Sequence, residues 1–190
     1  MPVRAALLVV DLLNDFFDRS PALTAARPGL TTRANALAQE FRSRGWPVIW
    51  IRQEFAPDLH DAPGEVRANQ IYVTVAGTRG CELLSELERR PEDRVVVKKR
   101  YSAFFGTSLL GTLRDLETEA VVIAGVNTHA CVRMTAVDAY QHDFDVVLVE
   151  DAVASHDDEH HHVTLRYLRD KVARVVPADQ VIAAIATRAD

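Results

Sequence analysis

Three side chains with complementary chemistry each follow a short apolar run in this sequence. They are the carboxylate of Asp11, the ammonium group of Lys98 and the thiol of Cys131. Together these groups suit acyl transfer, because a carboxylate can accept the thiol proton while an ammonium group holds the thiolate by charge and orients the carboxylate. These roles require the fold to bring the three side chains into contact.

The segment around Cys131 predicts a strand, a tight turn and a helix. Residues 121–123 are an apolar, β-branched run typical of a strand buried on both faces, and Gly125 interrupts that run. Thr128 is a candidate N-cap, and apolar residues then recur at helical spacing as far as Tyr140. This pattern places Cys131 in the first turn of the helix.

A position in the first turn of a helix favours a reactive cysteine. Free N–H groups and the positive end of the helix dipole stabilise a thiolate and lower the thiol pKa from about 8.5. Backbone N–H groups near Asn127 and Cys131 also suit an oxyanion hole. The opposing interpretation is that Cys131 is a small buried hydrophobe, as free cysteines often are. This segment alone leaves both interpretations open.

Asp11, Lys98 and Cys131 each lie at or just beyond the carboxyl end of a predicted strand. In an open parallel sheet those ends share one edge, and ligands bind in the crevice outside that edge. Residues far apart in the sequence can therefore converge there. The alternative for Asp11 is a turn or N-cap aspartate, which is common where a strand ends.

Strands and helices alternate along the whole chain, which predicts a parallel sheet covered by helices on both faces. We expect one α/β domain over residues 1–190, with three α/β/α layers and a mostly parallel sheet. The expected strands are residues 5–10, 46–51, 94–97, 121–123, 145–149 and 172–176, with a short extended piece at 71–75. The expected helices are residues 30–44, 81–88, 107–116, 128–140, 157–168 and 179–187.

Composition excludes several classes of protein. The 190 residues carry a formal net charge of -5, which argues against a general nucleic-acid binder. Two cysteines form no disulfide framework and favour a reducing, cytoplasmic setting. The N-terminal apolar run is too short to span a membrane and ends in Asp11, so we interpret it as a first strand rather than a signal peptide.

Three segments together resemble the signature blocks of the isochorismatase-like cysteine hydrolases. They are LLVVDLLNDF, VVVKKRYSAFFGT and AGVNTHACVRMTAVDA, and they occur in the family's order over nearly the whole chain. That superfamily includes nicotinamidases, N-carbamoylsarcosine amidase, ureidoacrylate amidohydrolase and isochorismatases. The resemblance implies a Rossmann-like fold, with Asp11 as general base and acid, Lys98 as its partner and Cys131 as nucleophile. It also implies a cis peptide bond at Val126-Asn127 that aims the Asn127 amide into the oxyanion hole.

The implied reaction is a two-step hydrolysis of a small molecule through a thioester, with no cofactor. The retained Cys131 favours a C–N bond in an amide, carbamoyl or ureido group. Vinyl ether hydrolysis of the isochorismatase type is the nearest alternative; enzymes of that type can lack the cysteine, which this chain retains. A non-catalytic binding protein on the same scaffold is a third possibility.

The metal motif of related nicotinamidases is incomplete in this chain. Its position after the second strand reads Gln53-Glu54-Phe55-Ala56, so the first histidine is missing, and Glu54 and His60 alone make no convincing site. The run SHDDEHHHV, with four histidines between His156 and His162, fits a solvated helix start better than a metal site. We therefore expect no metal.

Residues next to the strand ends are the candidates for substrate contact. They are Phe16, Gln53, Tyr101 and His129, and a structural role for the His129 ring in packing the turn is an equal alternative. We also expect a homo-oligomer, a dimer or tetramer, by family resemblance and because the long loop over residues 55–70 needs something to pack against.

Overall fold

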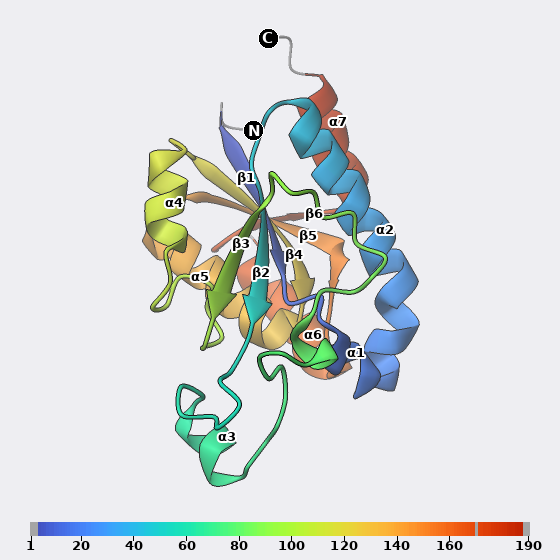
Figure 1. Ribbon diagram of the computed structural model, residues 1–190. Coiled ribbons are helices and arrows are strands. Elements are labelled where there is room, and N and C mark those ends of the chain that lie inside the picture. Colours follow the sequence, from blue (N-terminus) through green and yellow to red (C-terminus); the bar gives the residue numbers. More distant parts are fainter. Residues whose placement is uncertain (1–3, 170, 188–190) are drawn as a thin grey trace.

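A parallel sheet forms the centre of the structure, a computed structural model that describes residues 4–169 and 171–187. In this part of the chain six strands pair in the order β3-β2-β1-β4-β5-β6, and every pairing is parallel (Figure 1). The strands are β1 (Ala5–Val10), β2 (Val48–Gln53), β3 (Arg94–Lys98), β4 (Ala120–Val126), β5 (Asp145–Ala154) and β6 (Arg174–Val176). The predicted parallel sheet is confirmed.

Helices cover both faces of the sheet, as Figure 1 shows. One hydrophobic core lies between the sheet and helices α2 and α7, and a second lies between the sheet and helices α4, α5 and α6. The helices are α1 (Asn14–Asp18), α2 (Pro21–Ser43), α3 (Gly64–Ala68), α4 (Leu109–Asp115), α5 (Arg133–Gln141), α6 (Asp158–Leu168) and α7 (Ala178–Ala186), with short turns η1 (Arg79–Cys81) and η2 (Thr128–Val132). The predicted α/β/α layers are therefore confirmed.

The central strands are buried because both of their faces are covered. All six residues of β1 and all seven of β4 are buried, which explains their continuous apolar sequences. Within the described residues, no helix is both long and apolar enough to cross a bilayer.

Helix α2 begins nine residues earlier than the apolar spacing predicts. Ser20 caps it by accepting a hydrogen bond from the backbone N–H of Leu23, and Pro21 occupies its first turn. The helix continues through Pro28, although proline removes one backbone hydrogen bond from a helix interior. The sequence pattern missed these first nine residues of α2 because apolar periodicity starts only at Leu30.

The predicted helix over residues 81–88 is wrong. Only the single turn η1 is helical; the chain is extended at its C-cap Glu82, the Leu84 N–H donates to the Leu12 carbonyl at 2.9 Å, and a non-helical turn follows at residues 85–87. Leu84 is buried in the core beside α2, so tertiary packing overrides the local helical spacing of the leucines. Residues 71–75 likewise form no strand, apart from an isolated bridge between Phe55 and Val75.

Gly125 allows β4 to lie close to β1 near the strand ends. Its φ is 124°, and it pairs in register with Val10, the residue before Asp11. A Cβ atom at this position would lie 2.0 Å from the Val10 carbonyl oxygen. Only glycine combines this φ with such a close backbone approach.

We predict that Gly125→Ala destabilises the fold by at least ~4 kcal/mol, because the clash involves backbone that cannot move without separating the two strands. Chemical denaturation followed by circular dichroism measures this loss. The matched control is Gly111→Ala in α4, where an added Cβ meets nothing within 4 Å and helix propensity predicts a small gain. A Gly125→Ala protein as stable as the control would contradict the argument.

Candidate active site

Asp11, Lys98 and Cys131 meet at the carboxyl edge of the sheet, as the strand-end argument predicts. The Lys98 Nζ atom lies 2.7 Å from Asp11 Oδ2 and 3.3 Å from Cys131 Sγ. Asp11 and Lys98 are fully buried, and Cys131 is 3% exposed. The ammonium group therefore sits between a carboxylate and a sulfur in a site that excludes water.

The backbone positions Asp11 immediately after β1. Its φ of 53° lies in the left-handed region, which aspartate tolerates better than most residues, and its N–H donates to the Ile51 carbonyl. Its Oδ1 atom accepts a hydrogen bond from the Gln53 backbone N–H at 2.8 Å. The end of β2 thus holds one carboxylate oxygen and leaves Oδ2 facing Lys98.

Lys98 is a charged side chain in a site without solvent, and its partners keep it charged. Burial alone would lower the pKa of the ammonium group, but the charge of the adjacent Asp11 carboxylate, with the hydrogen bonds from Nζ to Asp11 and Cys131, outweighs burial and raises it. A further contact joins Nζ to the Arg100 carbonyl at 3.1 Å. Lys98 is therefore an ammonium group at neutral pH.

The pKa of the Cys131 thiol corrects the expectation of a pre-formed thiolate. Burial raises this pKa to about 12; the Lys98 charge opposes the rise and the Asp11 charge adds to it. The helix-terminus argument considered only the local turn, whereas the loss of solvation dominates for the sulfur of a residue that is only 3% exposed. Cys131 is therefore a neutral thiol in the resting site.

The turn that carries Cys131 also differs from the prediction. It is the π-helical turn η2, which precedes α5, so Cys131 does not lie in the first turn of the α-helix. Asn127, rather than Thr128, occupies the cap position, and it makes no side-chain cap hydrogen bond. The Thr128 hydroxyl instead contacts the His161 ring at 2.9 Å.

Asn127 lies at the start of this turn, and its side chain makes two contacts with His156. The Val126-Asn127 peptide bond is cis, as the resemblance implied. The Asn127 Oδ1 atom accepts hydrogen bonds from the backbone N–H and from the ring Nδ1 of His156, both at 3.1 Å. Sequence reasoning missed this role of His156, because only the fold brings the end of β5 beside the end of β4.

A hollow of about 340 Å³ opens next to this turn. Its lining comes from α1, the start of α2, Asn127 and the segment after β5; the residues are Asp15, Phe16, Arg19, Ser20, Pro21, Leu23, Asn127 and His156. Phe16 and Asn127 are thus placed where a small molecule could approach the turn. The sequence did not single out Arg19 or His156 as residues of this hollow.

The other predicted contact residues have different surroundings. Gln53 is buried, and its side-chain amide donates to the Thr74 hydroxyl at 3.2 Å. His129 is half-buried, contacts the Ser155 hydroxyl at 2.5 Å and packs edge-on against His156. Tyr101 is 61% exposed, so the structure does not bring its side chain into the buried group.

The histidine run is only partly the solvated helix start that we expected. His156, His160 and His162 are exposed, and His160 and His162 contact acidic residues at the start of α6. His156 and His161 instead contact Asn127 and Thr128 in the turn that carries Cys131. In residues 4–169 and 171–187, no group of three or more His, Cys, Asp or Glu side chains is arranged to hold a metal ion. Glu54 pairs with Arg52.

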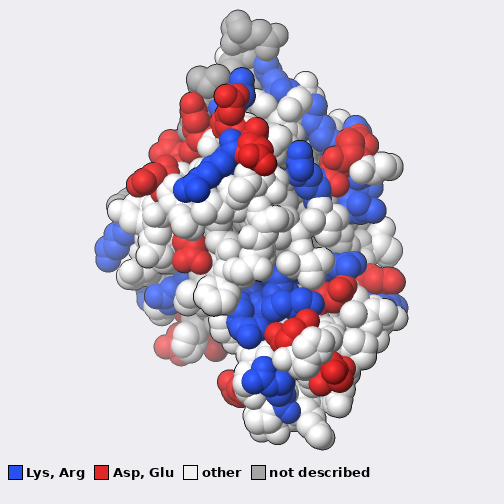
Figure 2. All heavy atoms as spheres, turned by 60° about the vertical axis from the view of Figure 1, so that its left-hand side comes forward, with Lys and Arg blue, Asp and Glu red and all other residues white. Residues whose placement is uncertain are grey.

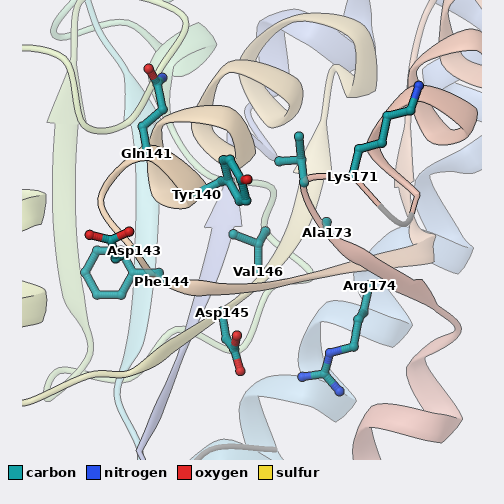
Figure 3. A pocket seen from close by; sticks show the side chains of 10 residues that line it. Tyr140, Gln141, Asp143, Phe144, Asp145, Val146, Lys171, Ala173 and Arg174 are labelled. Carbon is teal, nitrogen blue, oxygen red and sulfur yellow. The ribbon is translucent and has the colours of Figure 1, made fainter.

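A second hollow, about 610 Å³, lies away from these groups. Figure 3 shows Asp143 and Asp145 on one side of it and Lys171 and Arg174 on the other. It is formed where α5 ends and β5 and β6 begin, which is the opposite end of the strands from Asp11. None of the predicted site residues lines it.

Comparison with known proteins shows which sequences and structures this chain resembles. The isochorismatase domain model matches residues 5–180. A phenazine biosynthesis protein of Pseudomonas aeruginosa is 31% identical over 95% of this chain and 86% of its own length. A protein of Arabidopsis thaliana named as a probable inactive nicotinamidase is 35% identical over 82% of this chain and 83% of its own. The crystal structure of N-carbamoylsarcosine amidase from Thermoplasma acidophilum superposes with a TM-score of 0.79 and 30% identity, over 93% of this chain and 98% of that one.

We predict that Asp11→Asn lowers the pKa of Cys131 by roughly 1–3 pH units, because it removes a negative charge that opposes ionisation while Lys98 remains. The measurement is the rate of iodoacetamide labelling at Cys131 against pH, read by peptide mass spectrometry. Cys81 in the same molecule is the internal reference, and Asp145→Asn, an exposed position, is the matched control. An unchanged or higher labelling midpoint in Asp11→Asn would refute this electrostatic picture.

Proposed function

The chain belongs to the isochorismatase family of hydrolases, and on this premise we propose that it is a cysteine hydrolase that cleaves a C–N bond of a small amide, carbamoyl or ureido compound. The observation that carries the proposal is the contact between Lys98, Asp11 and Cys131 in a buried site. No single one of these groups would suffice, since the thiol needs a proton acceptor and the acceptor needs a balancing charge.

The resting protonation states set the order of the first step. Because the pKa of Cys131 is about 12, a free thiolate is rare at neutral pH. The thiol proton therefore moves to Asp11 as the sulfur attacks the carbonyl carbon, rather than before the substrate arrives. Lys98 offsets negative charge on whichever partner carries it, so the site never holds an unpaired charge.

In the second half of the reaction, the Asp11 carboxyl group first donates a proton and then accepts one. Backbone N–H groups at Asn127 and Cys131 hold the oxyanion of the tetrahedral intermediate, and Asp11 gives its proton to the departing nitrogen as the C–N bond breaks. Water then adds to the thioester with Asp11 as base. The C–S bond breaks, the proton returns to the sulfur and the acid product leaves.

The hollow beside the turn is the proposed place for the substrate. Phe16 offers an aromatic face, and Asn127 and His156 offer polar atoms at the start of the turn that carries Cys131. A cavity of about 340 Å³ suits a compact molecule rather than a protein chain, which fits the small amide or ureide of the proposed reaction.

Vinyl ether hydrolysis is the alternative function, and the neutral state of the Cys131 thiol is the observation that favours it. A neutral thiol beside a carboxyl group leaves Asp11 as the main proton-handling group. In that reaction Asp11 would first take up a proton from water and pass it to the vinyl carbon; water would then add to the resulting cation and the ether C–O bond would break, while the sulfur forms no bond. The two functions differ in whether Cys131 is essential.

We predict that Cys131→Ala lowers turnover at least about a thousandfold while the circular dichroism spectrum is unchanged. The assay is ammonia or amine release from a panel of small amides, carbamoyl compounds and ureides. Cys81→Ala, which removes the other buried thiol, is the matched control and should retain activity.

Three outcomes separate the candidate functions. Release by the wild type that is lost in Cys131→Ala supports the amidohydrolase. Turnover of vinyl ether compounds that survives Cys131→Ala supports the alternative. A wild type that is silent across both panels but binds members of them would indicate a non-catalytic binding protein.

A further inference from the structure

The side-chain amide of Asn127 has an orientation that the fold determines. Strands β4 and β5 end side by side, with Val126 paired in register with Ala154, so Asn127 and His156 meet just beyond the two strands. The Asn127 Oδ1 atom lies 3.1 Å from the backbone nitrogen of His156. A backbone N–H group can only donate, so the amide atom that it contacts is the oxygen and not the nitrogen.

The His156 ring holds the same oxygen a second time. Its Nδ1 atom lies 3.1 Å from Asn127 Oδ1, and because that oxygen is an acceptor, Nδ1 carries the hydrogen. The ring also packs edge-on against His129, with 5.0 Å between the ring centroids. Two donors and one ring contact therefore keep the side-chain amide of Asn127 in one orientation.

This orientation leaves the amide nitrogen of Asn127 to a group in the hollow. Asn127 is only 8% exposed, and among residues 4–169 and 171–187 its Nδ2 atom has no acceptor. Nδ2 is also not one of the described side-chain atoms that are both sealed from solvent and unpartnered, so it is reached from the hollow that Asn127 lines. Buried polar groups in proteins are nearly always hydrogen-bonded, and an acceptor in the hollow would complete this amide.

The charged side chains that line the hollow already have partners. Arg19 donates to the Tyr72 carbonyl at 2.6 Å, and its Nε atom lies 3.7 Å from the Asp15 carboxylate. The Ser20 hydroxyl caps α2. The positive charge in the hollow is thus balanced within the protein, and the Asn127 amide favours a neutral acceptor over an anion.

We propose that the side-chain amide of Asn127 is a specificity-determining donor to the substrate, and that His156 is the positioning residue that holds it. This role rests on the proposed function, in which the backbone N–H of Asn127 binds the oxygen of the scissile carbonyl. Only the Cα, Cβ and Cγ atoms separate the two nitrogen atoms of the residue, so the two acceptors that they bind lie close together in the substrate. The substrate class is therefore a small amide or ureide with a second neutral acceptor, such as a carbonyl oxygen, a few bonds from the scissile carbonyl.

A pair of neutral probes tests this specificity without requiring turnover. Acetoacetamide and isovaleramide have nearly the same shape, but the first carries a ketone oxygen where the second carries a methyl group. Each is tested for protection of Cys131 against iodoacetamide at one fixed pH, read by peptide mass spectrometry with Cys81 as the internal reference. Neutral probes are used because Lys and Arg side chains gather on one face of the molecule, as Figure 2 shows, and would attract an anionic probe.

The wild type should bind acetoacetamide at least about fivefold more tightly than isovaleramide, because only the ketone oxygen accepts a hydrogen bond from Nδ2. Asn127→Asp keeps an oxygen for His156 and replaces the donor by an acceptor, so it should reverse the preference in favour of isovaleramide. The ratio of the two protection constants within one protein cancels any change in the reactivity of Cys131.

Variants of His156 separate positioning from packing. His156→Leu removes the ring donor but keeps the backbone N–H, and it should lower the ratio at least about threefold. His156→Gln, whose side-chain amide can donate to Asn127, should restore most of the ratio. His162→Leu, at an exposed histidine of α6 that pairs with Asp158, is the matched control and should leave the ratio unchanged. Unchanged circular dichroism confirms that each variant is folded.

Each contrary outcome removes a defined part of the proposal. A wild-type ratio near one, a ratio that Asn127→Asp leaves unchanged, or no protection by either probe would overturn the role of Asn127. A ratio that His156→Leu leaves unchanged would overturn the positioning role of His156. Turnover of amides without this preference would leave the proposed hydrolase standing. A wild type without turnover would refute the hydrolase, while the protection ratio would still decide the role of Asn127.

Discussion

The buried ion pair between Lys98 and Asp11 is the interaction on which the rest of the site depends. An ammonium group without access to water is tolerated only when a counter-charge lies close to it, and the 2.7 Å contact supplies that charge. The contact joins the end of β3 to the end of β1 across the intervening β2, which also donates to the carboxylate. Removing either partner would leave an uncompensated charge in the core.

The same burial that makes the ion pair necessary also keeps the Cys131 thiol neutral. Desolvation outweighs the nearby ammonium group and raises the pKa of Cys131 to about 12. In the proposed reaction, reactivity is therefore not stored in a thiolate and depends on proton transfer from sulfur to Asp11 as a carbonyl group accepts the electron pair.

Close backbone approach provides the second structural constraint. Gly125 lets β4 pack against β1, and the cis bond at Val126-Asn127 begins the turn that carries the sulfur. The segment after β5 then completes the site, because His156 binds the Asn127 side chain. Strands β1, β4 and β5, which are neighbours in the sheet, thus fix the position of the turn that carries Cys131. The edge strand β3 supplies the Lys98 ammonium group.

The sequence by itself determined the alternation of strands and helices, the three candidate residues Asp11, Lys98 and Cys131, and the family that the chain resembles. Those features follow from local periodicity and from motifs that do not need long-range contacts. Tertiary structure decided what depends on solvation and on distant neighbours: the neutral state of Cys131, the contact of His156 with Asn127, the exposure of Tyr101 and the extended path after η1. The physical reason is that burial and hydrogen-bond partners belong to the packed fold, and no local pattern reports how much water a side chain loses.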